Sequence, residues 1–208
     1  MDISSRTFSE GEMIPERCAY GRMGEGGQTV RSANLSPELS WSGAPAGTKS
    51  FAVLCIDDDV PTDLKARDAS GELPVDQTRR RFVHWVQIEV AADVSNFPEG
   101  VFAQKNVPAA YGRPGLNDYC RGAGKPEADG TGLGYDGPCP PFFDARRHYY
   151  RYQVLALDLE TLDLDKHFTL EDFEKTAKGH VLATAEVVGR YTCLLYTSQS
   201  PRDAHESR

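Results

Sequence analysis

The pattern of hydrophobic and polar positions predicts short strands separated by long loops. Residues 50–57 (SFAVLCID) form an apolar run of strand length, bounded by turn residues, which indicates a central strand. We expect this strand to stop at Asp57-Asp58-Asp59, because three consecutive carboxylates cannot remain in an apolar layer without partners. A second strand is predicted over 81–90. Its period of two would divide the side chains between two faces, with Val83, Trp85 and Gln87 on one and His84, Val86, Ile88 and Val90 on the other.

The remainder of the chain predicts one further strand, one helix and two long loops. Aromatic and branched residues favour a strand over 149–158, which His148 opens. Thr169, with an acidic residue three positions later, predicts a short helix near 170–178. Residues 62–80 and 97–147 lack a period and indicate loops, the second of them ordered by its many aromatic groups. Residues 180–191 carry both periods, so helix and strand stay open there.

Composition places the chain in the mainly β class. Nineteen glycines and 13 prolines among 208 residues favour strands and structured loops over a helical bundle. The length suits one domain, which we place at 1–192. The end, 193–208, resembles a translated sequencing adapter, so we expect a non-native tail there and exclude it from fold reasoning.

The charge and the cysteines exclude several classes of partner. A net charge of −8 argues against a nucleic-acid partner, and the run Arg79-Arg80-Arg81 is interpreted as a solvated loop edge. No apolar run is long enough for a membrane span and the start lacks the features of a signal peptide, so we expect a cytoplasmic protein. Five cysteines without a CxxC pair indicate neither a disulfide framework nor a zinc site.

Three segments combine side chains that are costly to bury alone. They contain Asp57 and Asp59, then His84, then a Pro-rich run followed by His148 and Tyr150. An imidazole among aliphatic residues needs a hydrogen-bond partner, and Asp57 or Asp59 is expected to supply it for His84. Two imidazole N–H groups and a phenol O–H together suit the oxygens of a phosphate. These residues therefore predict a small anion pocket.

The same segments resemble the signature blocks of the phosphatidylethanolamine-binding (PEBP) family, also called Raf-kinase-inhibitor-like, in its bacterial and archaeal YbhB/YbcL-type branch. The matching blocks are DDDVP at 57–61, HWV at 84–86, GYDGPCPP at 134–141 and HYY at 148–150. The resemblance implies an antiparallel β-sandwich with a few short peripheral helices, and a phospholipid-binding or other phosphoryl-binding function. By position, it implies a ligand pocket formed by Asp57, Pro61, His84, Gly137, Pro140, His148 and Tyr150.

Two residues depart from the blocks of that family. Asp58 stands where the family has Pro, and Tyr149 stands where it has Arg, so both changes are expected to make the site less cationic. Arg113 or Arg121, in a later loop, offers a replacement positive charge near the mouth of the pocket.

The leading hypothesis is a binding protein without a cofactor, rather than an enzyme. A weak hydrolase that uses an Asp/His pair is the main alternative, although no Ser lies in a nucleophile-elbow motif. A metal site built from Asp57, His84 and His148, a regulatory protein–protein interaction and a homodimer are the other readings. The sequence identifies neither the physiological ligand nor a protein partner.

Overall fold

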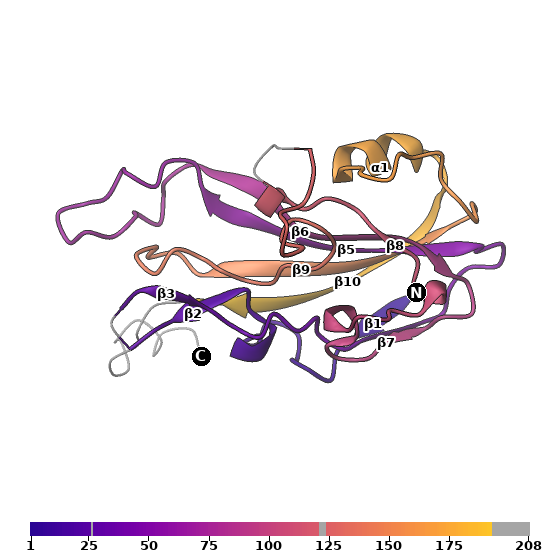
Figure 1. Ribbon diagram of the computed structural model, residues 1–208, viewed down its shortest axis with the longest axis horizontal. Coiled ribbons are helices and arrows are strands. Elements are labelled where there is room, and N and C mark those ends of the chain that lie inside the picture. Colours follow the sequence, from indigo (N-terminus) through magenta and orange to yellow (C-terminus); the bar gives the residue numbers. More distant parts are fainter. Residues whose placement is uncertain (26, 121–123, 193–208) are drawn as a thin grey trace, which may run out of the picture.

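The centre of the fold is a five-stranded antiparallel sheet in the order β10-β9-β5-β6-β8 (Figure 1). The computed structural model describes residues 1–25, 27–120 and 124–192. The strands of the sheet are β5 (Ser50–Pro61), β6 (Arg79–Ala91), β8 (Arg113–Pro114), β9 (His148–Leu157) and β10 (Val181–Tyr191).

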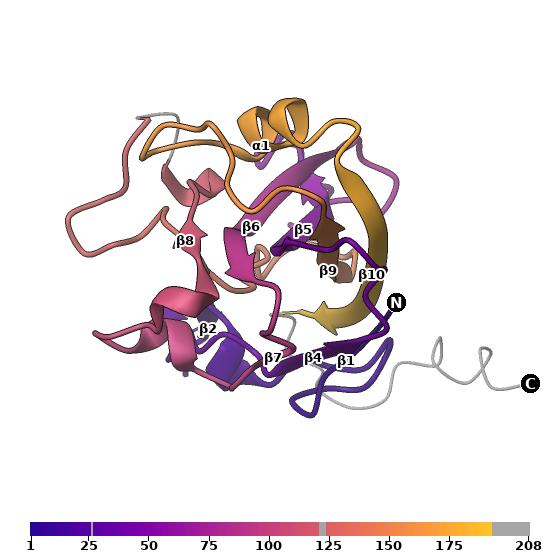
Figure 2. The same cartoon turned by 90° about the vertical axis from the view of Figure 1, so that its right-hand side faces the viewer.

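A second sheet and a helix cover the two faces of the central sheet. Figure 2 shows β1 (Asp2–Ser4), β4 (Leu39–Ser42) and β7 (Asn96–Phe97) on one side, and α1 (Leu170–Thr176) on the other. Trp41 and Phe97 of the small sheet pack in the same apolar cluster as Phe51, whereas Leu170 and Phe173 of α1 pack in a second cluster with Leu54. The predicted mainly β sandwich is therefore confirmed.

The remaining elements are short. A third, two-stranded sheet pairs β2 (Gly21–Met23) with β3 (Thr29–Arg31). The described loops contain four 3-10 helices: η1 (Glu16–Cys18), η2 (Val101–Ala103), η3 (Ala109–Tyr111) and η4 (Asp118–Cys120). Across the described ranges, no helix is long and apolar enough to cross a membrane.

The predicted helix is confirmed, and its start follows the local sequence. The Thr169 hydroxyl accepts from the backbone N–H of Asp172, while the Asp172 carboxylate accepts from the backbone N–H of Thr169. This reciprocal capping box satisfies two groups that a helix start leaves unpaired. The sequence left helix and strand open for residues 180–191, and all of them except His180 form strand β10, which pairs with β9 along almost its whole length.

The expectation that the central strand stops at Asp57 is wrong, since β5 continues to Pro61. The acidic run stays in the strand because each carboxylate has a partner. Asp57 binds His148, Asp58 points outward to Arg151, and Asp59 accepts the backbone N–H of Tyr149. Burial that would be unfavourable for isolated charges is thus compensated.

The predicted division of faces on β6 is also wrong, because β6 carries a bulge at His84. Cys55 pairs with Trp85 but Ile56 pairs with Val83, so His84 is an extra residue opposite β5. Val83 therefore packs in the cluster under α1, and Trp85 packs in the cluster under the small sheet. The His84 ring contacts Tyr150, a member of the same cluster as Trp85. A bulge re-aims side chains in this way, and it places His84 and Trp85 on one side of the sheet.

Candidate functional site

A cavity of about 200 Å³ lies where β5 ends and β6 and β9 begin. Six of the seven residues predicted from the sequence line it: Asp57, Pro61, His84, Pro140, His148 and Tyr150. Leu64, from the loop between β5 and β6, forms part of the wall, as do Phe82 and Tyr119. That loop, which extends beyond the sheet in Figure 1, therefore contributes to the pocket.

His148 is held between two carboxylates. Its Nδ1 lies 2.6 Å from Oδ2 of Asp57, and its Nε2 lies 3.0 Å from Oδ2 of Asp144. Burial lowers the pKa of His148, but the hydrogen bonds to Asp144 and Asp57 outweigh it and raise the pKa to about 9. At neutral pH the ring is an imidazolium whose two N–H groups both donate to protein carboxylates. The ring nitrogens of His148 are thus occupied by the protein itself.

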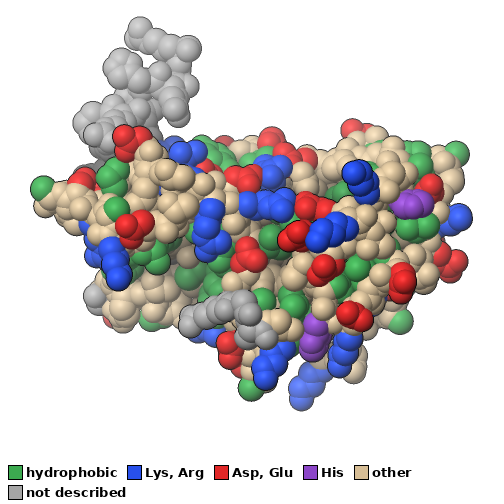
Figure 3. Space-filling view, turned by 90° about the horizontal axis from the view of Figure 1, so that it is seen from above, with side chains coloured by type: hydrophobic (Ala, Val, Ile, Leu, Met, Phe, Trp, Pro, Cys, Tyr) green, Lys and Arg blue, Asp and Glu red, His purple; other side chains and the backbone are tan. Residues whose placement is uncertain are grey.

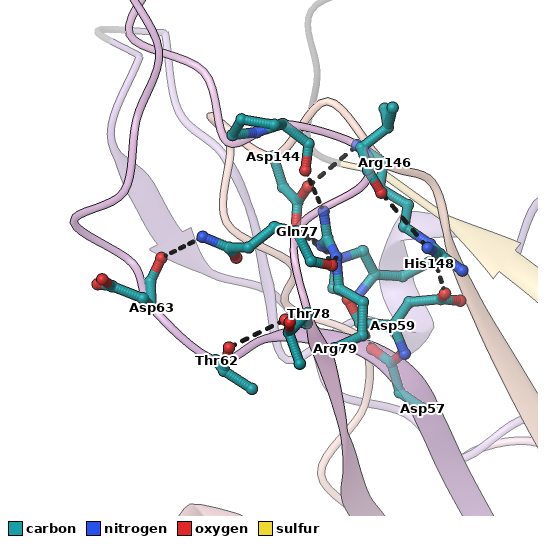
Figure 4. A network of polar contacts seen from close by, with 12 residues as sticks. Asp57, Asp59, Thr62, Asp63, Gln77, Thr78, Arg79, Asp144, Arg146 and His148 are labelled. Atoms are coloured by element: carbon teal, nitrogen blue, oxygen red, sulfur yellow. Dashed lines mark hydrogen bonds and ion pairs between the residues drawn. The ribbon is translucent and has the colours of Figure 1, made fainter.

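The ion pairs extend from His148 to the base of the loop between β5 and β6 (Figure 4). The Nη1 atom of Arg79 lies 2.5 Å from Oδ2 of Asp144, and its guanidinium also donates to the carbonyl oxygens of Asp59 and Pro74. The Arg79 side chain is only 6% exposed, so the sequence-based interpretation of this basic run as a solvated edge is wrong for Arg79. Arg146 lies 2.7 Å from Asp59 at the surface of the same network.

His84 is held differently from the sequence-based expectation. Among the described residues, no carboxylate contacts its ring nitrogens. Instead, Nδ1 lies 2.8 Å from the backbone carbonyl oxygen of Asp136, and the backbone N–H of Asp136 donates to the carbonyl oxygen of His84. A carbonyl oxygen only accepts, so Nδ1 carries the hydrogen. Burial lowers the pKa of His84, although Asp57 and Asp136 oppose this effect. The ring is therefore neutral, with a bare Nε2.

Two buried polar atoms of the pocket have no hydrogen-bond partner among the described residues. They are Nε2 of His84 and the hydroxyl of Tyr150. Burial raises the pKa of Tyr150 well above its usual value, so the phenol keeps its proton and remains a donor. The two rings meet edge to face with centroids 5.1 Å apart. Buried polar groups normally have partners, so this pair leaves one acceptor and one donor available in the cavity.

Gly137 does not line the cavity but supports it. Its N–H donates to the Asn34 side chain, and its carbonyl oxygen accepts from the Tyr119 hydroxyl at 3.3 Å. A Cβ at this position would lie 2.0 Å from the carbonyl oxygen of Cys18. Only glycine permits this close approach of two backbone segments, and it does so without contacting the cavity.

The two departures from the family blocks lie outside the pocket. Asp58 points away from it and binds Arg151 at 2.6 Å, and the side chain of Tyr149 is exposed. Arg113 does not restore charge at the mouth, because it binds Glu89 and the carbonyl oxygens near 162–165. Arg121 lies outside the described residues. Instead, Arg80 lines the cavity with its guanidinium over the ring of Phe82.

No metal centre is formed by the residues predicted as ligands. Within the described ranges, no group of three His, Cys, Asp or Glu side chains has an arrangement suited to a metal ion. Both nitrogens of His148 already bind carboxylates, so Asp57, His84 and His148 do not converge on one point. Cys139 also lines the cavity, and burial raises the pKa of its thiol, which keeps it protonated.

Sequence reasoning missed the residues that hold the two histidines. Asp144 precedes His148 by four positions in a Pro-rich loop, and that spacing was the only available signal. Asp136 acts through its backbone, which no sequence motif reveals. Its side chain, with a pKa that burial raises, accepts from Asn34, Asn117 and the backbone N–H of Gly132.

The fold and the pocket define a β-sandwich protein with a small cavity at one end of its main sheet. The family model for phosphatidylethanolamine-binding protein matches residues 4–192, and the chain belongs to this family. The UPF0098 protein YbhB of Escherichia coli is 31% identical over 92% of this chain and 100% of its own length. A UPF0098 protein of Aquifex aeolicus is also 31% identical, over 92% of this chain and 88% of its own.

Solved structures agree with this assignment. The crystal structure of Escherichia coli YbcL, described as a member of the mammalian PEBP family, has a TM-score of 0.67 and 27% identity, covering 92% of this chain and 97% of its own. A putative PEBP homologue from Chlamydia trachomatis has a TM-score of 0.63 and 28% identity, covering 91% and 95%.

Proposed function

We propose that this protein binds a small ligand with a phosphate or phosphoryl group, or another anionic group, in the cavity between His84 and Tyr150. The observation that carries the proposal is the pair of unpartnered polar atoms, His84 Nε2 and the Tyr150 hydroxyl. A buried polar group without a partner costs about 1–3 kcal/mol, so a ligand that satisfies both atoms gains that energy on binding.

The charge around the cavity supports an anion only at the mouth. Inside, the charges of Asp57, Asp144 and Asp59 are balanced by His148, Arg79 and Arg146. Arg80 is different, since no ion pair of its guanidinium is found within the described residues, and it lines the cavity. Its positive charge is therefore available to an anionic ligand.

Binding without chemistry is favoured over hydrolysis. Burial keeps Cys139, Tyr119 and Tyr150 protonated by raising the pKa of each, so none of them is an activated nucleophile. The family to which the chain belongs is named for binding. The protein partner, the homodimer, the single domain with its non-native tail at 193–208, and the cytoplasmic location stay predictions.

A nucleic acid remains an unsuitable ligand on electrostatic grounds. The net charge is −8, and Figure 3 shows acidic and basic side chains interspersed over the face that carries α1. Duplex binding depends on clustered Lys and Arg that neutralise successive phosphates. A small anion needs only the few groups at the cavity.

The test is an NMR titration of the histidine ring signals with inorganic phosphate and with phosphorylethanolamine. We expect the His84 signals to shift strongly and those of His148 to shift less, because the protein already occupies both His148 nitrogens. His180, which binds Asp158 in a different part of the chain, is the internal control and should not move. Unchanged His84 signals at millimolar ligand would refute the proposal.

A further inference from the structure

Apart from Arg80 at the mouth, the described residues of the cavity leave one buried acceptor and one buried donor without a partner, rather than the set of donors that a fully ionised anion prefers. The acceptor is His84 Nε2, which is bare because Nδ1 donates to the Asp136 carbonyl oxygen. The donor is the Tyr150 hydroxyl. A phosphate oxygen that carries no proton would face the lone pair of Nε2, and this contact is repulsive.

Burial keeps the His84 ring neutral although two carboxylates lie near it. The titratable groups around it or lining the same cavity are Asp57 from β5, Arg80 from β6, His148 and Tyr150 from β9, Tyr119 from η4, and Asp136 and Cys139 from the loop before β9. The imidazolium of His148 opposes a second positive charge, while Asp57 and Asp136 favour one. The charge of Asp57 is already paired with His148 at 2.6 Å, so burial decides the balance.

We infer that the pocket selects phosphomonoesters in their protonated, monoanionic form, so that the P–OH donates to His84 Nε2 while another phosphoryl oxygen accepts from Tyr150. This inference rests on the proposed function and specifies its ligand class. A phosphomonoester loses its second proton with a pKa of about 6. Above that pH the free ligand is a dianion, so its binding takes up one proton from the solvent. In the complex this proton lies between Nε2 of His84 and the phosphoryl oxygen.

Phosphodiesters and sulfate esters are expected to bind more weakly. Neither carries an acidic proton near neutral pH, so neither can donate to Nε2 unless another group of the ligand does so. A bare acceptor facing an anionic oxygen lowers affinity by at least about tenfold, the effect of one unsatisfied buried group.

The test compares methyl phosphate with methyl sulfate by isothermal titration calorimetry on the full chain. Near pH 6 the two anions have the same shape and, for the monoanion of methyl phosphate, the same charge, and they differ in one P–OH. We expect methyl phosphate to bind at least about tenfold more tightly. From about pH 6 to pH 8 its affinity should fall roughly tenfold per unit, with uptake of one proton from the buffer, while methyl sulfate affinity stays constant.

Two variants test separately what the acceptor, His84, and the donor, Tyr150, contribute to ligand binding. Tyr150→Phe should weaken both ligands by the same factor and leave their ratio unchanged. His84→Gln should reduce the preference to within about threefold, because an amide can turn either its N–H or its oxygen toward the ligand. If His84→Gln does not fold, the inference is still tested by two measurements. One is the comparison of methyl phosphate with methyl sulfate on the unsubstituted protein, and the other is the same comparison on Tyr150→Phe.

The failures of the two proposals are distinguishable. If neither anion binds, the proposed function fails and the inference fails with it. If both bind equally without proton uptake, the anion pocket stands and the inference is overturned. If methyl sulfate binds with proton uptake, His84 becomes an imidazolium in the complex, which also overturns it.

Discussion

His148 Nδ1 lies 2.6 Å from Asp57 Oδ2, and both side chains are only 1% exposed. This pair joins the start of β9 to the second half of β5 in the wall of the pocket. The role of this pair is structural. The second nitrogen of His148 binds Asp144, so neither ring nitrogen is free for a ligand. The two histidines of the pocket therefore differ: both nitrogens of His148 bind protein carboxylates, whereas Nε2 of His84 has no partner among the described residues.

The charge of His148 makes stability depend on pH in the alkaline range. The folded-state pKa of about 9 lies above the ordinary value of 6.5, so the folded state binds the proton more tightly. The stabilisation is complete below about pH 6.5 and is lost as the pH rises through 9. A shift of this size corresponds to roughly 3 kcal/mol. Urea unfolding at several pH values between 6 and 10 measures it, and His148→Gln should remove most of the dependence.

Asp57→Asn should be strongly destabilising, because it leaves the His148 imidazolium with one of its two buried carboxylate partners missing. We expect a loss of roughly 3 kcal/mol in the free energy of unfolding, the size found when one partner of a buried pair is removed. Asp58→Asn is the matched control, since its ion pair with Arg151 is exposed and contributes at most about 1 kcal/mol. Equal effects of the two substitutions would contradict the assignment of Asp57.

Tyr150→Phe should weaken phosphate binding without lowering the free energy of unfolding. The hydroxyl has no partner in the described chain, so its removal leaves the free energy of unfolding unchanged or raises it by up to about 1 kcal/mol. Phosphate affinity should fall by roughly 2- to 10-fold, the value of one hydrogen bond. Thermal unfolding and calorimetric titration of the same preparation give both quantities. A large loss of stability would mean that the hydroxyl has a structural partner.

Gly137→Ala tests whether this residue supports the pocket through the backbone. Its Cβ would lie 2.0 Å from the carbonyl oxygen of Cys18, so the two segments must move apart. We expect a loss of at least about 2 kcal/mol in the free energy of unfolding. The Tyr119 ring, whose hydroxyl donates to Gly137, should also shift in an NMR spectrum. Unchanged stability would show that the loop accommodates a side chain.

Several features were predictable from the sequence because they depend on neighbouring residues. The helix at Leu170–Thr176 follows from Thr169 and Asp172, which form a capping box within four residues. The strand from His148 follows from its aromatic and branched side chains, which favour extended backbone. The membership of Asp57, His84, His148 and Tyr150 in one pocket came from their motifs, and the structure brings all four to the same cavity.

The roles within the pocket were decided only by the tertiary structure. The bulge that puts His84 beside Trp85 on one side of the sheet exists because β5 and β6 pair with a shifted register, and no local pattern in β6 reveals it. The strand over Val181–Tyr191 likewise depends on pairing with β9. Asp136, which binds His84, and Asp144, which binds Nε2 of His148, lie in a loop without a regular period, so neither could be assigned beforehand. Sequence determines which groups are available, whereas long-range packing determines which atoms of those groups remain free for a ligand.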